Sequence, residues 1–327
     1  MRGEQRFRAG APDSLPPHQD TPGGGAQGAL DGPRTLAVSI HEVSGVASLG
    51  DGRFAVVGDD DVKSFRIVDP IDGEVEHPFP SELIVEDAES IEYGVAGGEE
   101  LWLFLSENES TIHDQSGGEA DLESLTRKCL DELGFYGERL YEKTTEDPKV
   151  GWEGLALMRR GDAWRVAALY EGGLLDKASN LRDPEEAYIA LMDWTPGRDV
   201  EQAECFRLDV PVHLGQERFR ATDLVWSADG ESFYVLLGSE TLPLDRKGKY
   251  DPKGKRKHSH TWIVQFDGSG KRLAAFKMEE SAEWKRYREG KNFEALDWVW
   301  GEEGRQLVIG EDKKKATELR IFASPFQ

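Results

Sequence analysis

The chain has 327 residues, a length that fits either two average domains or one large all-β domain. Lys and Arg total 40 against 63 Asp and Glu, so the formal net charge is -23 and the surface as a whole repels nucleic acid and anionic membranes. With 38% hydrophobic residues the composition excludes a disordered acidic tail and indicates a packed domain.

Residues 1–33 are rich in Pro and Gly and contain no apolar stretch, so we expect a disordered leader rather than a signal peptide. No later segment has the length of a membrane span. We therefore expect a cytoplasmic protein that meets neither membrane nor nucleic acid, unless translation starts at a different Met and an export signal is hidden. The folded domain is predicted to occupy residues 34–327.

From residue 41 onward the chain repeats one pattern five times. Each copy is a hairpin in which an oxygen-bearing residue opens a short strand, a turn rich in Gly, Asp or Glu follows, and a second apolar strand ends in a small or acidic cluster. The copies are HEVSGVASLGDGRFAVVGDD, EDAESIEYGVAGGEELWLFLSEN, VGWEGLALMRRGDAWRVAALYEG, RATDLVWSADGESFYVLLGSE and KNFEALDWVWGEEGRQLVIGED. Such a repeat predicts an all-β, five-bladed β-propeller, and a sixth blade built from the insertions is the open alternative.

Outer strands follow most of these hairpins, for example SFRIVDP after the first and HTWIVQFD after the fourth. The last hairpin is followed only by TELRIFAS, so we expect RTLAVSI at residues 34–40 to pair with it and close the ring. The outer part of the second blade is expected from ERLYEKTTED, after an insertion at about residues 109–136. Within that insertion Leu122, Leu125, Cys129 and Leu133 have helical spacing and predict an amphipathic helix over a face of the ring.

One oxygen-bearing residue near the start of each inner strand should face the central axis. These residues are Ser44, Glu89, Glu153, Asp223 and Glu294. Carboxylates about 6 Å apart repel by roughly 3 kcal/mol per pair at an effective dielectric near 20, so a ring of four calls for a bound cation, raised pKa values or a wet channel. Oxygen ligands in an adaptable ring suit Ca²⁺, which is the cofactor that we predict. The alternative is that the acids bond backbone amides of the next blade and are structural.

A second acidic set follows the second strands of the hairpins. It comprises Asp59, Asp60, Ser106, Glu107, Glu171, Ser239, Glu240, Glu311 and Asp312. Most of these residues are expected to solvate turns rather than face the channel. The histidines His41, His113, His258 and His260 have no partner at catalytic spacing, and no catalytic residue can be named.

A second insertion, at about residues 241–259, contains most of the basic segment RKGKYDPKGKRKHSH. It predicts a mobile loop that closes over the mouth opposite the acidic ring and holds an anionic ligand through Arg256 and Lys257, or that is simply solvated. The two cysteines, Cys129 and Cys205, form no CxxC or Cys/His pattern, so we expect buried thiols and neither a zinc site nor a disulfide framework.

The segments HEVSGVASLGDGRFAVVGDDD, GWEGLAL and NFEALDW resemble the phytase-like, or SdiA-regulated-like, group of bacterial propeller domains, over roughly residues 36–325. The ring is also similar to that of the calcium-activated nucleotidases, or apyrases. That resemblance implies a central calcium bound by Ser and Glu side chains, one per blade. Ser44, Glu89, Glu153 and Glu294 match in kind, whereas Asp223 stands where the family tends to have Ser.

Two functions follow from these patterns. One is a calcium-dependent hydrolase of phosphate or other anionic esters, in which the ion polarises an oxygen and a carboxylate acts as base. The other is a scaffold without catalytic activity that binds a small anionic ligand or a protein partner. No residues that contact substrate in the apyrases can be matched elsewhere in this chain, which weakens the first function.

Overall fold

The structure is a computed structural model. It describes residues 34–323 except 41, 59–63, 71, 80–84, 97, 107–108, 134–150, 161–162, 172–173, 177–180, 183–186, 201, 211–216, 242–256, 279–291, 302–303 and 313–316. The leader 1–33, the segment ERLYEKTTED and Arg256 therefore lie outside the described residues.

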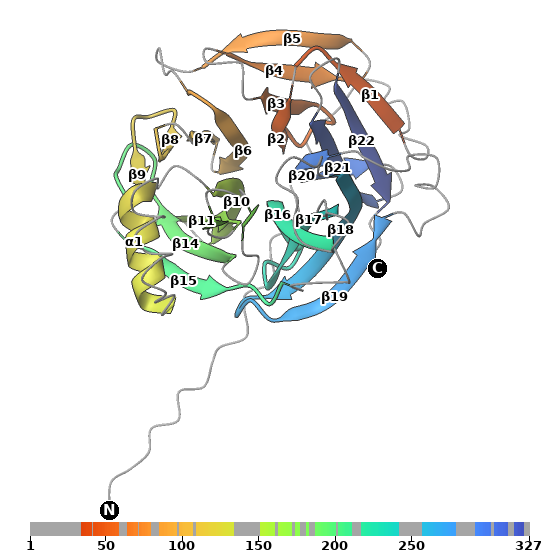
Figure 1. The fold of residues 1–327 in the computed structure, drawn as a ribbon. Coiled ribbons are helices and arrows are strands. Elements are labelled where there is room, and N and C mark those ends of the chain that lie inside the picture. Colours follow the sequence, from red (N-terminus) through yellow and green to blue (C-terminus); the bar gives the residue numbers. More distant parts are fainter. Residues whose placement is uncertain are drawn as a thin grey trace, which may run out of the picture.

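Five four-stranded antiparallel sheets surround a common axis (Figure 1). Blade 1 is β2 (Val43–Ser48), β3 (Phe54–Gly58), β4 (Ser64–Asp69) and β5 (Gly73–Pro78). Blade 2 is β6 (Ala88–Ala96), β7 (Glu99–Ser106), β8 (Thr111–Asp114) and β9 (Glu119–Asp121). Blade 3 is β10 (Trp152–Arg160), β11 (Ala163–Tyr170), β14 (Tyr188–Trp194) and β15 (Glu204–Arg207).

Blade 4 is β16 (Glu217–Trp226), β17 (Ser232–Thr241), β18 (Lys257–Asp267) and β19 (Arg272–Lys277). Blade 5 is β20 (Asn292–Gly301), β21 (Gly304–Asp312), β22 (Thr317–Ala323) and β1 (Arg34–Val38). A two-stranded ribbon of β12 (Leu174–Asp176) and β13 (Leu181–Arg182) lies between β11 and β14 along the chain. The five-bladed all-β propeller that the repeat predicts is confirmed.

The ring closes as predicted, because β1 pairs antiparallel with β22 from Arg34 opposite Ile321 to Val38 opposite Thr317. The first strand of the described chain is thus the outer strand of the last blade, and β22 is paired with a neighbour on both sides. The inner strands β2, β6, β10, β16 and β20 contact one another in sequence around the axis. The candidate site lies at the ends where these inner strands begin.

The apolar core is divided into clusters that lie between neighbouring blades. The cluster between blades 4 and 5, for example, joins Leu236 and Ile263 to Leu296 and Ile309. Between blades 2 and 3, Trp152 and Trp194 are fully buried with Leu103 and Leu105. Adjacent blades are therefore held by burial of apolar side chains, which is the main favourable term in folding.

Two expectations about the region after blade 2's hairpin are wrong. The outer strands of blade 2 are β8 and β9, which pair at Thr111 opposite Asp121, and do not come from ERLYEKTTED. The predicted helix is α1 (Leu122–Leu133), but it contacts β15, β8 and β9 at the outer rim between blades 2 and 3 and does not cover a face of the ring (Figure 1). A short connection after β7 was enough to complete the blade.

The expectation of two buried thiols is also wrong. Cys129 on α1 and Cys205 on β15 form a disulfide across a sequence separation of 76 residues. Helical spacing turns Cys129 toward the core, and β15 brings Cys205 to the same place at the rim. The spacing of the two cysteines along the sequence does not indicate this disulfide, which forms because α1 packs against the neighbouring blade.

Candidate functional site

Each inner hairpin has a register shift at its first residues, and the residue left unpaired by the shift is the ring position. The five residues are Ser44, Glu89, Glu153, Thr222 and Glu294. A bulge of this kind redirects one side chain without breaking the strand. In blade 4 the residue left unpaired by the shift is therefore Thr222, and the predicted ligand Asp223 is the residue after it. Two oxygen-bearing residues stand side by side there, and the carboxylate is the second of them.

Asp223 occupies the position in which the other blades have Gly45, Ser90, Gly154 and Ala295. Its carboxylate accepts the backbone N–H of Leu224 at 2.8 Å and that of Leu296, in blade 5, at 2.6 Å. Ser90 plays the same part in blade 2, since its Oγ accepts the Leu155 N–H at 3.1 Å. Asp223 is thus a structural link between inner strands, as the amide-binding alternative anticipates for an acid at this place.

Arg220 is the centre of the site, and the sequence analysis missed it. From β16 its guanidinium donates to Glu171 Oε2 at 2.6 Å through Nε, to Glu153 Oε2 at 2.9 Å through Nη2 and to Glu294 Oε1 at 3.1 Å through Nη1. Three carboxylates from blades 3 and 5 therefore converge on one arginine of blade 4. We call these four residues the Arg220 cluster.

The Arg220 cluster lies at one end of the channel, where the inner strands begin; we call this the ring end. Glu171 and Glu153 are buried, Glu294 is largely buried and the Arg220 side chain is 30% exposed. Buried carboxylates need a positive partner. The one signal in the sequence is Arg220 itself, a cation two residues before the ring position of a strongly acidic repeat.

Glu171 and Glu311 do not solvate turns, contrary to the expectation for most of the second acidic set. Both are buried, and Glu311 pairs at 3.1 Å with the buried Arg320, whose guanidinium also lies 5.2 Å from the centre of the Phe293 ring. Ser106 and Ser239 are buried as well. Asp59, Asp60 and Glu107, and the side chains of Glu240 and Asp312, lie outside the described residues.

Four of the five predicted calcium ligands bind other groups in the described part of the chain, and the ion itself stays a prediction. Glu153 and Glu294 are brought together, but by Arg220; Asp223 points to backbone amides; the Ser44 hydroxyl donates to the Glu42 carbonyl at 3.1 Å. Among the described residues, no three His, Cys, Asp or Glu side chains form a group that could hold a metal ion. The positive charge that the ring calls for is supplied by a guanidinium.

A second group of carboxylates lies deeper along the inner strands. Burial raises the pKa of Glu92 well above its usual range, and the nearby charges of Asp297 and Asp223 raise it further. Burial likewise raises the pKa of Asp223, against the lowering effect of its two amide bonds. Asp297 accepts the backbone N–H of Ser48 in blade 1, so it too links neighbouring inner strands.

Glu92→Gln is expected to reduce the dependence of stability on pH. A raised pKa means that the folded state keeps a proton that the unfolded chain loses; this contribution is full below the unfolded pKa near 4.3 and is lost as pH rises through the folded value. The thermal midpoint of the wild type should therefore fall from pH 5 to pH 8 by more than that of the variant. Exposed Glu231→Gln is the control; a variant as steep as the wild type would contradict the assignment.

The basic segment leaves the ring end, not the opposite mouth. It begins after β17, which ends at Thr241, and its last four residues, 257–260, are the first residues of β18, where Lys257 pairs with Thr241. Thr241 also pairs with Glu217 at the start of β16, three residues before Arg220. The segment's role in binding an anion stays a prediction, because Arg256 and the Lys257 side chain lie outside the described residues.

Two other features lie away from the ring end. His113 contacts Glu109 Oε2 at 2.8 Å and Glu119 Oε1 at 3.2 Å within blade 2, so this histidine has acidic neighbours that the sequence did not reveal. A cavity of about 540 Å³ lies between blades 3 and 4 and is lined by Arg207, Asp209 and Lys271 among others, and none of its lining residues is on an inner strand. Neither feature brings chemistry to the channel.

The fold and the ring define this protein as a five-bladed β-propeller whose channel carboxylates are neutralised by an internal arginine. No family model and no curated protein matches the chain. Among solved structures it is similar to the WD40 β-propeller domain of Doa1, with 10% identity over 90% of this chain and 96% of that chain, at a TM-score of 0.35.

A structural genomics protein of unknown function from Bacteroides thetaiotaomicron is similar at 9% identity, over 90% of this chain and 71% of that chain, with a TM-score of 0.37. Neither likeness bears on activity. The described residues include no helix with the length and apolar character needed to span a bilayer.

Proposed function

We propose that this chain is a binding propeller without catalytic activity, which receives a protein partner at the ring end. The observation that carries the proposal is the Arg220 cluster. Three carboxylates that would otherwise have to hold a cation or a substrate already bind one guanidinium, with distances of 2.6 to 3.1 Å. Residues so engaged hold blades together and are poorly placed to activate water.

The lengths of the connections favour the ring end as the binding face. At the opposite end, which we call the turn end, the hairpins close with short connections such as 49–53 and 227–231. At the ring end the strands are joined by longer segments, including 171–187, 242–256 and 278–291. Binding residues are found disproportionately on loops that a rigid scaffold positions. The asymmetry therefore supports recognition at the end that carries Arg220.

Site-specific photocrosslinking tests this proposal. A benzophenone amino acid replaces exposed Glu86, which precedes β6 at the ring end, or exposed Asp72, in the turn between β4 and β5 at the turn end. In an extract of the source organism we expect one protein to crosslink through position 86 and not through position 72. That protein, once purified, should bind this chain in a titration. Equal crosslinking from both positions, or none from position 86, would count against the proposal.

The calcium-dependent hydrolase is the alternative, supported by the similarity of the ring to that of the apyrases. Thermal unfolding of the purified protein in EDTA and in excess Ca²⁺ or Mg²⁺ distinguishes the hydrolase from the binding propeller. Ligand at 100 times its dissociation constant stabilises by about 2.7 kcal/mol, which shifts the midpoint by degrees. We expect no calcium-selective shift. A shift that is lost in Glu153→Gln and Glu294→Gln would favour the hydrolase and call for a screen of phosphate esters.

A further inference from the structure

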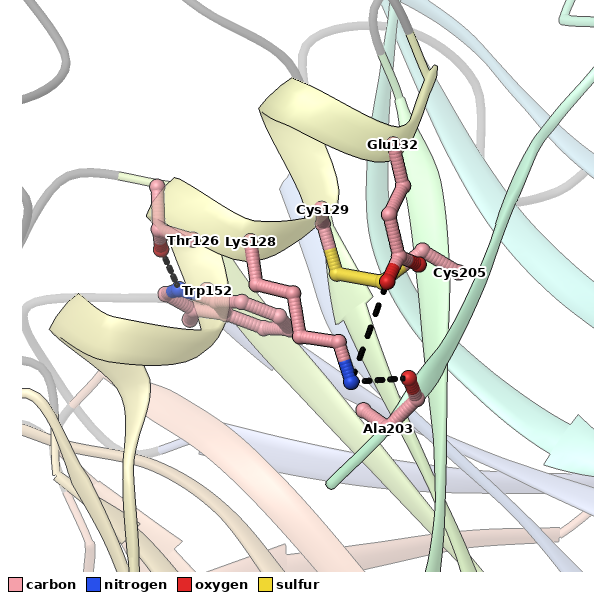
Figure 2. Close-up of a disulfide and its surroundings, with 7 residues drawn as sticks. All are labelled: Thr126, Lys128, Cys129, Glu132, Trp152, Ala203 and Cys205. Atoms are coloured by element: carbon pink, nitrogen blue, oxygen red, sulfur yellow. Dashed lines mark hydrogen bonds and ion pairs between the residues drawn. A yellow bond between two sulfur atoms is a disulfide. The ribbon is translucent and has the colours of Figure 1, made fainter. Parts of the chain in front are cut away.

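The helix α1 is held at its two ends by different means. Asp121 caps the beginning, because its Oδ1 accepts the N–H groups of Glu123 at 2.9 Å and Ser124 at 3.2 Å. The later turns are tied to blade 3 by the Cys129–Cys205 disulfide and by Lys128, whose Nζ donates to the Ala203 carbonyl at 3.0 Å (Figure 2). Reduction of the disulfide therefore removes the covalent tie from the second half of the helix only.

The buried face of α1 also contacts the first residue of the inner strand of blade 3. The Thr126 hydroxyl accepts the indole N–H of Trp152 at 2.8 Å, and both side chains are fully buried (Figure 2). Trp152 packs edge-on against Tyr170 and Tyr188, with ring centres 5.4 and 5.6 Å apart. Thr126 lies one turn before Cys129, so the disulfide positions the hydroxyl that holds the indole.

The next residue in each of two strands belongs to the Arg220 cluster. Trp152 is followed by Glu153, and Tyr170 is followed by Glu171. The two strand ends are joined by the hydrogen bond from the Glu171 N–H to the Gly151 carbonyl at 2.7 Å. The Tyr170 ring packs directly on Gly151, because a Cβ atom added to this glycine would lie only 2.8 Å from the ring. A shift of the Trp152 and Tyr170 rings would thus move both blade 3 carboxylates relative to Arg220.

We infer that the Cys129–Cys205 disulfide is a redox latch, which acts through Thr126 and Trp152 to set how firmly the Arg220 cluster is held. With the bond closed, α1 is fixed to β15 and the ring end is rigid. With the bond reduced, α1 opens at its C-terminal half and the cluster loosens. The inference does not depend on the nature of the partner, since it concerns the order of the ring end alone.

The chemistry of opening is thiol–disulfide exchange with a dithiol. One thiolate of the reductant attacks the Cys205 sulfur, because Cys205 is half-buried whereas Cys129 is fully buried, and Cys129 leaves as a thiolate that takes up a proton. The second thiol of the reductant then displaces Cys205 and forms a cyclic disulfide. Two electrons and two protons pass to the protein. Disulfides persist in oxidising compartments and are opened by dithiols elsewhere, so the latch would report its surroundings.

Hydrogen exchange read by mass spectrometry tests the latch in the full chain at 25 °C. Wild type is compared with and without dithiothreitol, next to Cys129→Ser, which should match the reduced wild type and not respond to the reductant. We expect amides of the second half of α1 and of residues 152–155 and 220–224 to exchange at least tenfold faster when the bond is open. Amides of β2 and β3 in blade 1 should be unchanged, because no hydrogen bond or ion pair of α1, the disulfide or the Arg220 cluster described above reaches those two strands.

Two outcomes would overturn the inference. Equal acceleration in all five blades would mean that the bond only stabilises the fold, and acceleration confined to α1 and β15 would mean that the rim and the ring end are not coupled. Thr126→Val with the disulfide intact tests the route itself: residues 152–155 should exchange at least tenfold faster while the second half of α1 stays protected. Wild-type exchange at residues 152–155 in that variant would exclude the route through Thr126.

Discussion

Arg220→Ala is expected to lower the free energy of unfolding by about 3 kcal/mol, because breaking a buried ion pair leaves uncompensated charge and costs about 3–5 kcal/mol, less where a side chain is partly exposed. The variant would leave Glu153, Glu171 and Glu294 facing one another without the guanidinium that now bonds all three. Urea denaturation at pH 7.5 measures the loss.

Two further variants define what this loss means. Arg220→Lys keeps the charge but presents one compact donor group in place of a planar fork, so an intermediate loss is expected. Arg127→Ala is the matched control, since Arg127 pairs with Glu123 on the exposed side of α1 and such surface pairs contribute about 0.5 kcal/mol. If Arg220→Ala were no worse than Arg127→Ala, the cluster would not hold the ring end together.

Asp114→Ala is expected to cost about 4 kcal/mol, the largest effect of a single substitution that we predict, because several buried donors lose their acceptor at about 1–3 kcal/mol each. One carboxylate of β8 accepts four hydrogen bonds. Oδ1 accepts the N–H groups of Ser116 at 2.7 Å and Gly118 at 2.9 Å; Oδ2 accepts the Trp194 indole N–H at 2.9 Å and the Gly197 N–H at 2.8 Å. The residue joins the outer turns of blades 2 and 3.

Asp114→Asn removes the charge but keeps the shape of the side chain. The amide retains one acceptor oxygen, and its NH₂ group faces two of the N–H donors that the second carboxylate oxygen accepts. It should lose less than Asp114→Ala. Asp193→Ala, an exposed position on β14, is the control and should stay within about 0.5 kcal/mol of the wild type. Urea denaturation of the three variants gives the ranking, and a loss below 1 kcal/mol for Asp114→Ala would show that water replaces the carboxylate.

Much of the fold could be predicted because its signal is local. Alternating apolar residues and tight turns mark each inner hairpin. The chain has no further strand after TELRIFAS, so the last blade needed a fourth strand from elsewhere, and β1 supplies it. The outer strands of blade 2 were predicted wrongly because their local signal is weak. Its outer strands β8 and β9 are only four and three residues long, too short for an alternating pattern to stand out.

The candidate site was predicted less well, because its contacts join blades and depend on bulges. A bulge moves one residue out of register. In blade 4 that residue is the uncharged Thr222 and not the carboxylate residue Asp223, which the acidic pattern of the other blades favoured. Arg220 and Glu171 are far apart in sequence and meet only because β11 and β16 are neighbours around the axis. The ring of acids was expected to need a bound cation, raised pKa values or a wet channel, and Arg220 supplies a positive charge that was not among these alternatives. The calcium ion itself stays a prediction.

The pairing of β1 with β22 has a consequence for the order of events during synthesis. Residues 34–38 leave the ribosome before any other described strand, yet their partner strand, residues 317–323, comes near the end of the chain. Blades 1 to 4 hold all their strands within one stretch of sequence each, so they can form as they emerge. The fifth blade cannot, and until it does the nascent chain carries an open sheet at each side of the gap. Completion of the circle is therefore a late, long-range step, of the kind that slows folding and exposes strand edges to wrong partners.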